Sequence, residues 1–359
     1  MSEEELNRHF KSAVLNSHAY HVPDASGLIK LDAMENPYHL PEECIAAWQA
    51  ELSKADVNRY PDASMHAMRE AVTDAFSIPS EYGLMFGNGS DELIQILLIA
   101  VKKASKILSP EPTFVMYKHL GEMLDHEFIG VPLQEDFTLD LPLMLDTIKT
   151  TQPEIVFLAW PNNPTGVAYA QSDIEQIIEA SNGLVIVDEA YHAFAKHTML
   201  NKIADYPNLL VMRTLSKLGL AGLRLGFLVG SQTIIAELEK VRMPYNIGSL
   251  NQLSVSFICN HIDLLLKQTE QIKQDRENLL EELSNIEGIH AWPSDTNFIL
   301  FKVTSQSADW VHQQLIGKKI LIKNLTKAHS ALANCLRVTV GTPEENDKFI
   351  QALKQILAA

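Results

Sequence analysis

The stretch that decides the fold is Leu184-Val-Ile-Val-Asp-Glu-Ala-Tyr191, in which a short apolar run is closed by an acidic residue. Similar apolar runs, each ending in a polar or Gly/Pro cluster, alternate with helical patterns; they lie at residues 84–86, 106–108, 155–159, 184–187, 209–212 and 225–229. Continuous hydrophobicity indicates strands that are covered on both faces, which is typical of a mainly parallel sheet flanked by helices. We therefore expect an α/β fold for the centre of the chain.

Outside this central region the periodicity changes. A long charged helical pattern at about residues 254–286 is followed by strand-like runs at 297–302 and 320–323, and by a terminal helix after Pro343. The first 45 residues show little regular pattern beyond one short helix at about residues 41–50. We expect a large ligand-binding domain over residues 46–250, and a smaller α+β domain built from the N-terminal arm, residues 1–45, and residues 251–359.

The composition excludes several classes of function. The chain has 359 residues, 46% hydrophobic and 21% charged, which is a globular balance and not that of a disordered chain. A net charge of −16 repels nucleic acid and anionic lipid, so we expect neither as a partner. The N-terminus is acidic where a signal peptide would be basic, and the 3 Cys have no zinc-ligand spacing. We expect a cytoplasmic protein without a metal site.

Ligands of open parallel sheets bind outside the carboxyl ends of the strands, so the residues after the apolar runs are the site candidates. Gly87-Asn-Gly-Ser-Asp-Glu92 precedes a helix that starts near Ser90, and its small residues and free amides favour an anion such as phosphate. Trp160-Pro-Asn-Asn-Pro-Thr-Gly166 forms a loop stiffened by proline that would present the amide of Asn163 in a set direction. A plain turn remains the alternative for both segments.

Two further strand ends carry charge. Burying Asp188 beside its apolar run is costly unless a cation or a hydrogen-bond donor meets it, and a helix N-cap is the competing explanation. Lys217 lies among small and apolar residues in Arg213-Thr-Leu-Ser-Lys-Leu-Gly-Leu-Ala-Gly-Leu-Arg-Leu-Gly226. Desolvation would lower its pKa and make its amine a nucleophile toward an aldehyde, whereas a surface lysine would keep its charge in water.

Together these strand ends supply what one cofactor needs. Pyridoxal phosphate requires a lysine for a Schiff base, a carboxylate at its pyridine nitrogen, donors to its phenolic oxygen and a cup for its phosphate. Lys217 and Asp188 would fill the first two roles, and Asn163 with Tyr191 the third. The cup would come from Ser90, Thr214, Ser216 and Arg224.

Three motifs resemble the cofactor motifs of fold-type I pyridoxal phosphate enzymes of the aspartate aminotransferase superfamily: Asn163-Pro-Thr-Gly166, Asp188-Glu-Ala-Tyr191, and Thr214-Leu-Ser-Lys217 followed by Arg224. Within class II of these enzymes the chain is most similar to the histidinol-phosphate aminotransferases. Features of that narrower family are Glu35-Asn-Pro-Tyr38, Asn58-Arg-Tyr-Pro-Asp62, Asn297-Phe298 and Leu336-Arg-Val-Thr-Val-Gly-Thr342. The resemblance covers nearly the whole chain and implies a cofactor-binding large domain with a smaller α+β domain.

The resemblance implies a role for each matched residue. Lys217 would carry the Schiff base, Asp188 would pair with the pyridine nitrogen, and Tyr191 would contact the phenolic oxygen; these would be the catalytic residues. Phe114 would stack on the cofactor ring. The phosphate would be surrounded by Gly89, Ser90, Asp91, Thr214, Ser216 and Arg224, with Tyr60 reaching it from the neighbouring subunit of a homodimer. The substrate would be bound by Tyr20, Asn163 and Arg337.

The implied reaction transfers the amino group of the small molecule L-histidinol phosphate to 2-oxoglutarate, giving imidazole acetol phosphate and L-glutamate in histidine biosynthesis. Arg337 could also bind the α-carboxylate of an amino acid, so an aromatic amino acid aminotransferase is an alternative function. A threonine-phosphate decarboxylase is another. A silent dinucleotide- or metabolite-binding protein is a third alternative, against which the missing third glycine of a dinucleotide motif counts. Lys323 stands where many relatives carry arginine, which removes a bidentate phosphate donor.

Overall fold

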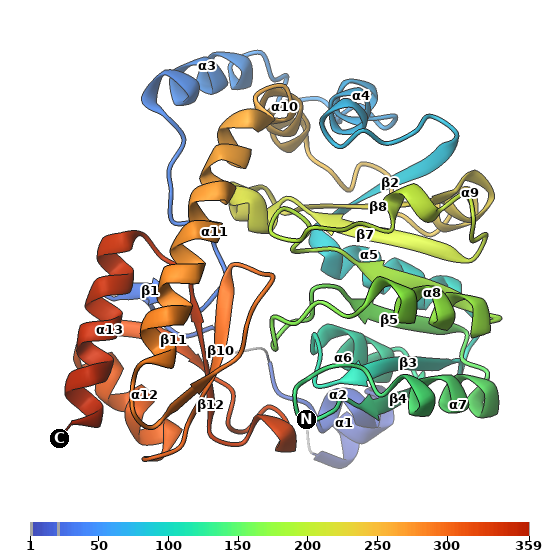
Figure 1. The fold of residues 1–359 in the computed structure, drawn as a ribbon. Coiled ribbons are helices and arrows are strands. Elements are labelled where there is room, and N and C mark those ends of the chain that lie inside the picture. The colour runs from blue at the N-terminus through green and yellow to red at the C-terminus, as the bar shows by residue number, and fades with distance from the viewer. Residues whose placement is uncertain (1–2, 20–21, 359) are drawn as a thin grey trace.

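The structure is a computed structural model that describes residues 3–19 and 22–358 (Figure 1). Within this part of the chain, strands of the large sheet lie in the order β2-β8-β7-β6-β5-β3-β4. Their bounds are β2 Tyr82–Asn88, β3 Lys106–Glu111, β4 Glu127–Pro132, β5 Ile155–Ala159, β6 Leu184–Asp188, β7 Leu209–Thr214 and β8 Leu225–Ser231. Neighbours from β4 to β7 are parallel, whereas β8 is antiparallel to both β7 and β2. The sheet is therefore mainly parallel, as expected.

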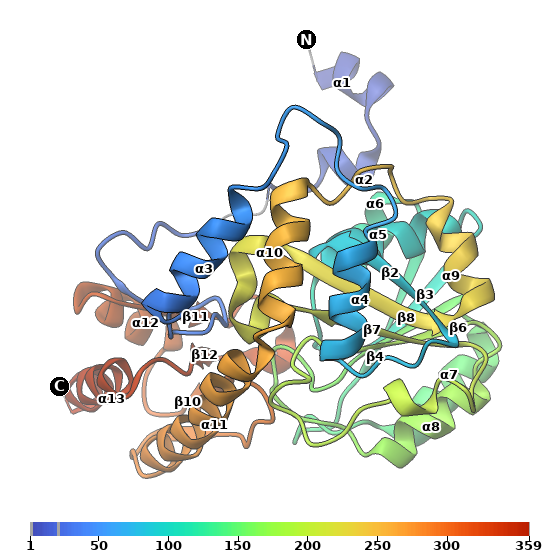
Figure 2. The same ribbon diagram turned by 90° about the horizontal axis from the view of Figure 1, so that it is seen from above.

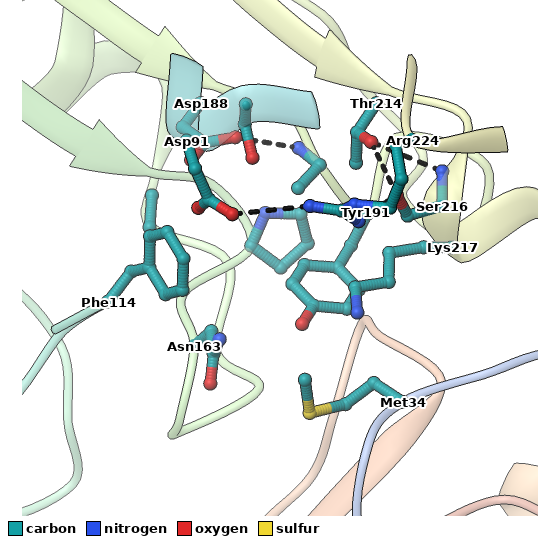
Figure 3. A pocket seen from close by; sticks show the side chains of 14 residues that line it. Met34, Asp91, Phe114, Asn163, Asp188, Tyr191, Thr214, Ser216, Lys217 and Arg224 are labelled. Atoms are coloured by element: carbon teal, nitrogen blue, oxygen red, sulfur yellow. Dashed lines mark hydrogen bonds and ion pairs between the residues drawn. The ribbon is translucent and has the colours of Figure 1, made fainter. Parts of the chain in front are cut away.

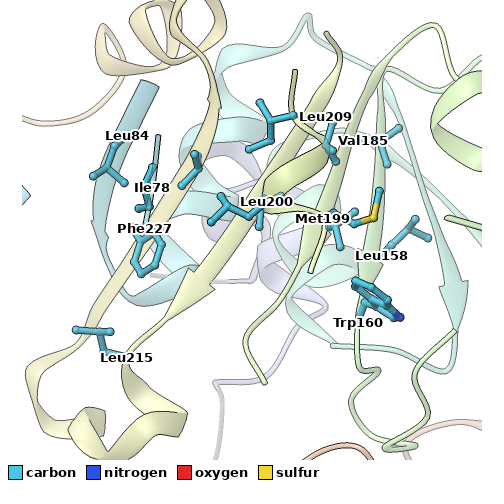
Figure 4. Close-up of a cluster of buried hydrophobic side chains, with 14 of the residues drawn as sticks. Ile78, Leu84, Leu158, Trp160, Val185, Met199, Leu200, Leu209, Leu215 and Phe227 are labelled. Carbon is cyan, nitrogen blue, oxygen red and sulfur yellow. The ribbon is translucent and has the colours of Figure 1, made fainter. Parts of the chain in front are cut away.

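Helices cover both faces of this sheet because its strands are apolar on both faces. Val185 and Val187 of β6 pack into one core cluster, while Ile186 between them packs into another on the opposite face. The first cluster, shown in Figure 4, includes residues of α4 His66–Ala75, α7 Leu141–Thr151, α8 Gln171–Ala180 and α10 Ser249–Cys259. The second includes residues of α5 Gly89–Ala100, α6 Met116–Met123 and α9 Gln232–Glu239. This layering explains the continuous hydrophobic runs.

A smaller sheet has the strand order β1-β11-β12-β10-β9. Its strands are β1 Ile29–Leu31, β9 Ile289–Ala291, β10 Phe298–Val303, β11 Ile320–Asn324 and β12 Cys335–Thr339. Strand β1 pairs with β11 in parallel, and the other pairs are antiparallel. Helices α11 Ile262–Ser284, α12 Ala308–Gly317 and α13 Pro343–Leu357 pack with it around a separate core. Residues 29–31 of the N-terminal arm are thus joined to the C-terminal third of the chain.

The structure corrects two predictions of secondary structure. The single helix expected at residues 254–286 is two helices, α10 and α11, because α10 packs on α3 and α4 while α11 packs on the small sheet and α13 (Figure 2). The first 45 residues contain more regular structure than expected, namely α1 Glu3–His9, α2 Ser12–Leu15 and β1, before α3 Glu42–Leu52. Elements this short carry too few residues to show a periodicity.

The domain boundaries remain predictions. Residues 45 and 250 both fall inside helices, α3 and α10, that contact each other. Short helical turns complete the described chain at Leu200–Lys202, Ser216–Leu220, Ala221–Leu223 and Ser330–Leu332. A search of the described helices finds none with the length and apolar character needed to cross a membrane.

Candidate active site

A pocket lies at the carboxyl ends of β5, β6 and β7, at the edge of the large sheet that faces the small one (Figure 3). It encloses about 580 Å³ of space, part of it open to solvent. Predicted site residues around it are Ser90, Asp91, Phe114, Asn163, Asp188, Tyr191, Thr214, Ser216, Lys217 and Arg224. The structure therefore brings together side chains that are far apart in the sequence and that come from five separate strand ends and loops.

Lys217 lies on a tight π-helical turn, Ser216–Leu220, just after β7. Its Nζ donates a hydrogen bond to the backbone oxygen of Ala33, at 3.2 Å. Burial is the main cause that lowers the pKa of Lys217 to about 8; the positive charge of Arg337 acts in the same direction, and the negative charge of Glu35 opposes it. The amine is therefore neutral in a larger fraction of molecules than an exposed lysine would be, as a nucleophile or a base requires.

Asp188 is the last residue of β6, and it is 4% exposed. Its Oδ2 accepts a hydrogen bond from the Tyr117 hydroxyl at 2.6 Å, and its Oδ1 accepts one from the backbone N–H of Ala190 at 3.0 Å. Burial raises its pKa to about 6, although both hydrogen bonds act in the opposite direction. Turns rather than a helix follow Asp188, so the N-cap explanation is wrong.

An anion cup is built where α5 begins. The guanidinium of Arg224 donates to Asp91 Oδ2 at 3.3 Å and to Ser216 Oγ at 3.4 Å, and Thr214 Oγ1 accepts the backbone N–H of Ser216. Gly89 has φ +77°, and a Cβ there would lie 2.7 Å from an Arg224 nitrogen. The positive φ favours glycine at this position, and a Cβ there would force the flexible Arg224 side chain to move away from the turn.

Two polar groups that could donate a hydrogen bond to a phenolic oxygen also line the pocket. Asn163 Oδ1 accepts a hydrogen bond from Arg337, which leaves the Nδ2 end of the amide as the donor toward a ligand. The buried hydroxyl of Tyr191 forms no hydrogen bond with any described residue, and burial raises its pKa, so it stays a protonated donor. A buried hydroxyl without a protein partner at a pocket fits a polar ligand atom. Phe114 lies across the pocket from Lys217, as an aromatic stacking on a ring would (Figure 3).

Arg337 enters the site from the small sheet. It lies on β12, directly opposite Lys323 of β11, and its guanidinium donates to the backbone oxygen of Asp32 at 3.2 Å. The guanidinium carbon is also 5.0 Å from the centre of the Phe298 ring. These contacts fix a planar, permanently charged group next to Asn163, which suits a carboxylate or a phosphate.

Comparison with known proteins identifies the family. Residues 26–353 match the family described as aminotransferase class I and II. The chain belongs to this family. The aminotransferase is 46% identical over 355 residues, 99% of each chain, to histidinol-phosphate aminotransferase 2 of Nitrosococcus oceani. The predicted family and the predicted class of enzyme are thus confirmed, and the silent binding protein is excluded.

Solved structures confirm the fold. The aminotransferase is similar to the histidinol-phosphate aminotransferase of Sinorhizobium meliloti in complex with pyridoxal-5'-phosphate, with a TM-score of 0.85 and 21% identity over 98% of both chains. It is also similar to the L-threonine-O-3-phosphate decarboxylase of Porphyromonas gingivalis, with a TM-score of 0.79 and 18% identity over 92% of this chain and 100% of that one. One fold therefore supports both reactions, and the fold alone does not choose between them.

Tyr60, which was predicted to act from the neighbouring subunit, lies away from the pocket of the aminotransferase. Tyr60 is 81% exposed and stacks on Tyr245, with ring centres 4.6 Å apart, and it does not line the pocket of its own chain. Tyr20 lies outside the described residues. Among the described residues, no group of three or more His, Cys, Asp or Glu could hold a metal ion.

Two residues at the site of the aminotransferase were not found by sequence reasoning. Tyr117 lies on α6, and its hydroxyl donates a hydrogen bond to Asp188. The only sequence feature that could have indicated this residue is its position three residues after Phe114. Met34 lines the pocket with a positive φ of 55°, and its only signal is that it precedes the motif Glu35-Asn-Pro-Tyr38. Neither residue type by itself points to pyridoxal phosphate chemistry.

Proposed function

We propose that this aminotransferase binds pyridoxal 5'-phosphate and transfers the amino group of L-histidinol phosphate to 2-oxoglutarate. The products would be imidazole acetol phosphate and L-glutamate, in histidine biosynthesis. The observation that carries the proposal is one pocket that holds a lysine of lowered pKa, a buried carboxylate and an anion cup. The name of the Nitrosococcus relative, which matches this chain over 99% of its length, supports the choice of substrate.

The donor set of the pocket fits the cofactor. Asp188 would pair with the pyridine nitrogen, and Asn163 and Tyr191 would donate to the phenolic oxygen. Phe114 would cover one face of the ring. The phosphate would lie in the cup formed by Gly89, Ser90, Asp91, Thr214, Ser216 and Arg224. When bound, pyridoxal phosphate supplies an electron sink for the carbanion formed at the substrate Cα.

Lys217 would both anchor the cofactor and move the proton. Its lowered pKa leaves a larger fraction of the amine neutral near physiological pH than in an exposed lysine, so that Nζ can take a proton from the substrate Cα and deliver it again. The backbone oxygen of Ala33, which accepts a hydrogen bond from Nζ, orients the amine when it is free. Asp188 contributes a negative charge that holds a proton on the ring nitrogen.

Arg337 would bind the anionic end of each substrate. Its guanidinium is held by Asp32 and Asn163, and Lys323 lies opposite it in register. Two cationic side chains on neighbouring strands suit the phosphate of histidinol phosphate, and the same guanidinium suits a carboxylate of glutamate or 2-oxoglutarate. Tyr20 would complete this end of the site.

A homodimer would complete the cup. Tyr60 and Val57 are among the most exposed large hydrophobic residues of the described chain, at 81% and 78%. Met243, two residues before the Tyr245 ring that stacks on Tyr60, is 68% exposed. Covering such residues with a second copy removes apolar surface from water. Tyr60 would then reach the phosphate of the neighbouring subunit. We place the protein in the cytoplasm, where its small-molecule substrates would be made and consumed.

The visible absorption spectrum of the purified protein tests the proposal. We expect a yellow protein that loses its colour when L-histidinol phosphate is added without any keto acid, because the amino group is then retained by the cofactor. Loss of colour with an aromatic amino acid only would support the aromatic aminotransferase instead, and release of carbon dioxide from threonine phosphate would support the decarboxylase. A colourless protein that takes up no pyridoxal phosphate would refute the proposal.

A further inference from the structure

Tyr117 is a buried titratable residue that none of the roles above uses. It lies on α6 with 0% of its surface exposed, and its hydroxyl donates to Asp188 Oδ2 at 2.6 Å. Its ring is stacked on Phe157, with centres 4.5 Å apart and planes 3° apart, and it meets Phe114 edge-on at 5.5 Å. These ring contacts hold the hydroxyl at one position, directly behind the carboxylate.

The carboxylate of Asp188 is held at both oxygens. Oδ2 takes the Tyr117 hydroxyl, and Oδ1 takes the backbone N–H of Ala190. An ionised carboxylate is an acceptor only, so both donors bind the charged form, and each oxygen keeps a further lone pair for a ligand. The tyrosine bond is the one of these two that a side-chain substitution can remove.

We propose that Tyr117 is a positioning residue that keeps Asp188 ionised and oriented toward the pocket, so that the carboxylate can pair with a protonated pyridine nitrogen. The inference rests on the proposed function, because it takes Asp188 as the partner of the cofactor ring. Tyr117 is not itself a catalytic residue, since its hydroxyl touches Asp188 and acts through it.

The electrostatic surroundings of Asp188 show why a donor is needed. Burial is the main cause that raises its pKa to about 6, and the carboxylates of Asp91 on α5 and of the neighbouring Glu189 act in the same direction. The Tyr117 bond is the largest influence in the other direction. Glu189 is itself paired with Arg213, at 2.8 Å, and Asp91 with Arg224. Without the tyrosine hydroxyl, Asp188 would stay protonated to a higher pH and could not pair with a protonated nitrogen.

Two matched variants isolate the hydroxyl. Tyr117→Phe removes only the donor and keeps the ring that stacks on Phe157. Tyr169→Phe is the control, because Tyr169 is 4% exposed and its hydroxyl forms no hydrogen bond with any described residue. Both variants remove one buried hydroxyl from the large-sheet core, but only Tyr117→Phe also removes a hydrogen bond, so an effect of the missing hydroxyl group alone would appear in both.

The first measurement is the free energy of urea unfolding of the cofactor-free protein as a function of pH. A carboxyl group whose pKa is raised by folding stabilises the folded protein at pH values below its unfolded pKa of 3.8. That stabilisation is lost as the pH rises through the folded pKa of about 6. In Tyr117→Phe we expect the pKa of Asp188 in the folded protein to be higher still, so folding stability continues to fall at higher pH. We expect the destabilisation of Tyr117→Phe to grow between about pH 6 and about pH 8, while that of Tyr169→Phe stays constant.

The second measurement is the affinity for pyridoxamine 5'-phosphate, which has the same ring and phosphate but forms no bond with Lys217. At about pH 8 we expect Tyr117→Phe to bind about tenfold more weakly than wild type, as the loss of one hydrogen bond to a charged group predicts. The deficit should shrink at about pH 6, where the wild-type carboxyl is itself partly protonated. Tyr169→Phe should bind pyridoxamine 5'-phosphate as tightly as wild type at both pH values.

The outcomes separate this inference from the proposed function. If wild type binds pyridoxamine 5'-phosphate, but Tyr117→Phe and Tyr169→Phe share one pH dependence of stability and one affinity, the positioning role is wrong and the function stands. If wild type binds neither pyridoxamine nor pyridoxal phosphate, the proposed function falls and this inference falls with it.

Discussion

The two walls of the pocket are built in different ways. The strand-end wall consists of Asp188, Thr214, Ser216 and Lys217, each at or soon after the end of β6 or β7, and Arg224, which directly precedes β8. The small-sheet wall consists of Met34, which lines the pocket, and Arg337 of β12, which donates to the lining residue Asn163; they come from opposite ends of the chain. The first wall follows directly from where parallel strands end, whereas the second exists only once the two sheets face each other.

Hydrogen bonds across long sequence separations hold the small-sheet wall. The backbone N–H of Met34 donates to Thr339 Oγ1 at 3.0 Å, and Asn297 Nδ2 donates to the Met34 oxygen at 3.0 Å. Asn36 Nδ2 donates to the Leu218 oxygen at 3.0 Å and so joins this wall to the turn that carries Lys217. These bonds also hold Met34 at a backbone angle that a bulky residue seldom adopts. The groups that we propose carry the chemistry are thus placed by local structure, whereas the groups that we propose face the substrate are placed by contacts between distant parts of the chain.

Removing the amine of the strand-end wall should have the largest effect. We expect Lys217→Ala to lower turnover by about 10⁴-fold or more, because both the nucleophile and the proton carrier are lost. Steady-state rates measure the loss, and Lys240→Ala is a suitable control because that side chain is 67% exposed. Near-normal turnover by Lys217→Ala would show that this wall does not carry the chemistry.

Removing the carboxylate of the same wall should have the next largest effect. We expect Asp188→Ala to fold and to lose about 10²- to 10³-fold in kcat, because one preorganised charge is removed from the developing reaction centre. Circular dichroism checks the fold, and single-turnover rates check the chemistry. An unchanged kcat would count against the pairing of Asp188 with the cofactor ring.

The small-sheet wall should control binding more than chemistry. We expect Arg337→Lys to raise KM for the phosphate-bearing donor by about tenfold with a smaller change in kcat, because a bidentate donor becomes a point charge. Parallel measurements with histidinol phosphate and with an aromatic amino acid test whether the same residue serves both. If kcat fell and KM did not change, the division between the two walls would be wrong.

The junction between the walls should give the smallest effect. Asn36→Ala removes the hydrogen bond to Leu218 and a second one to Gln268 Oε1, at 2.9 Å. We expect a loss of about 1–3 kcal/mol in the free energy of unfolding and a fall of only a few-fold in kcat/KM. The control Asn182→Ala also loses an amide bond, to Gln152, but far from the site in the described chain. Equal effects of both variants on kcat/KM would remove any special role for the junction.

Most of the strand-end wall could be predicted because its residues follow recognisable apolar runs. Asp188 closes an apolar run typical of a buried strand, and Lys217 follows another, so the rule for parallel sheets predicts that both lie at the same edge of the sheet. Tyr117 could not be found in this way. Its hydroxyl meets Asp188 because α6 packs against the sheet, a contact between residues 71 positions apart. A tyrosine in an amphipathic helix has the same pattern whether or not it serves a carboxylate.

The sequence by itself determined the α/β class, the strand ends that carry the chemistry and the family, since apolar runs and short motifs are local patterns that reflect local geometry. The tertiary structure alone decided the break between α10 and α11, the place of Met34, the tyrosine behind Asp188, and the register that sets Arg337 opposite Lys323. Such features depend on which faces pack together. Packing is a property of pairs of distant segments, and a local pattern records only that a face is apolar, not what will cover it.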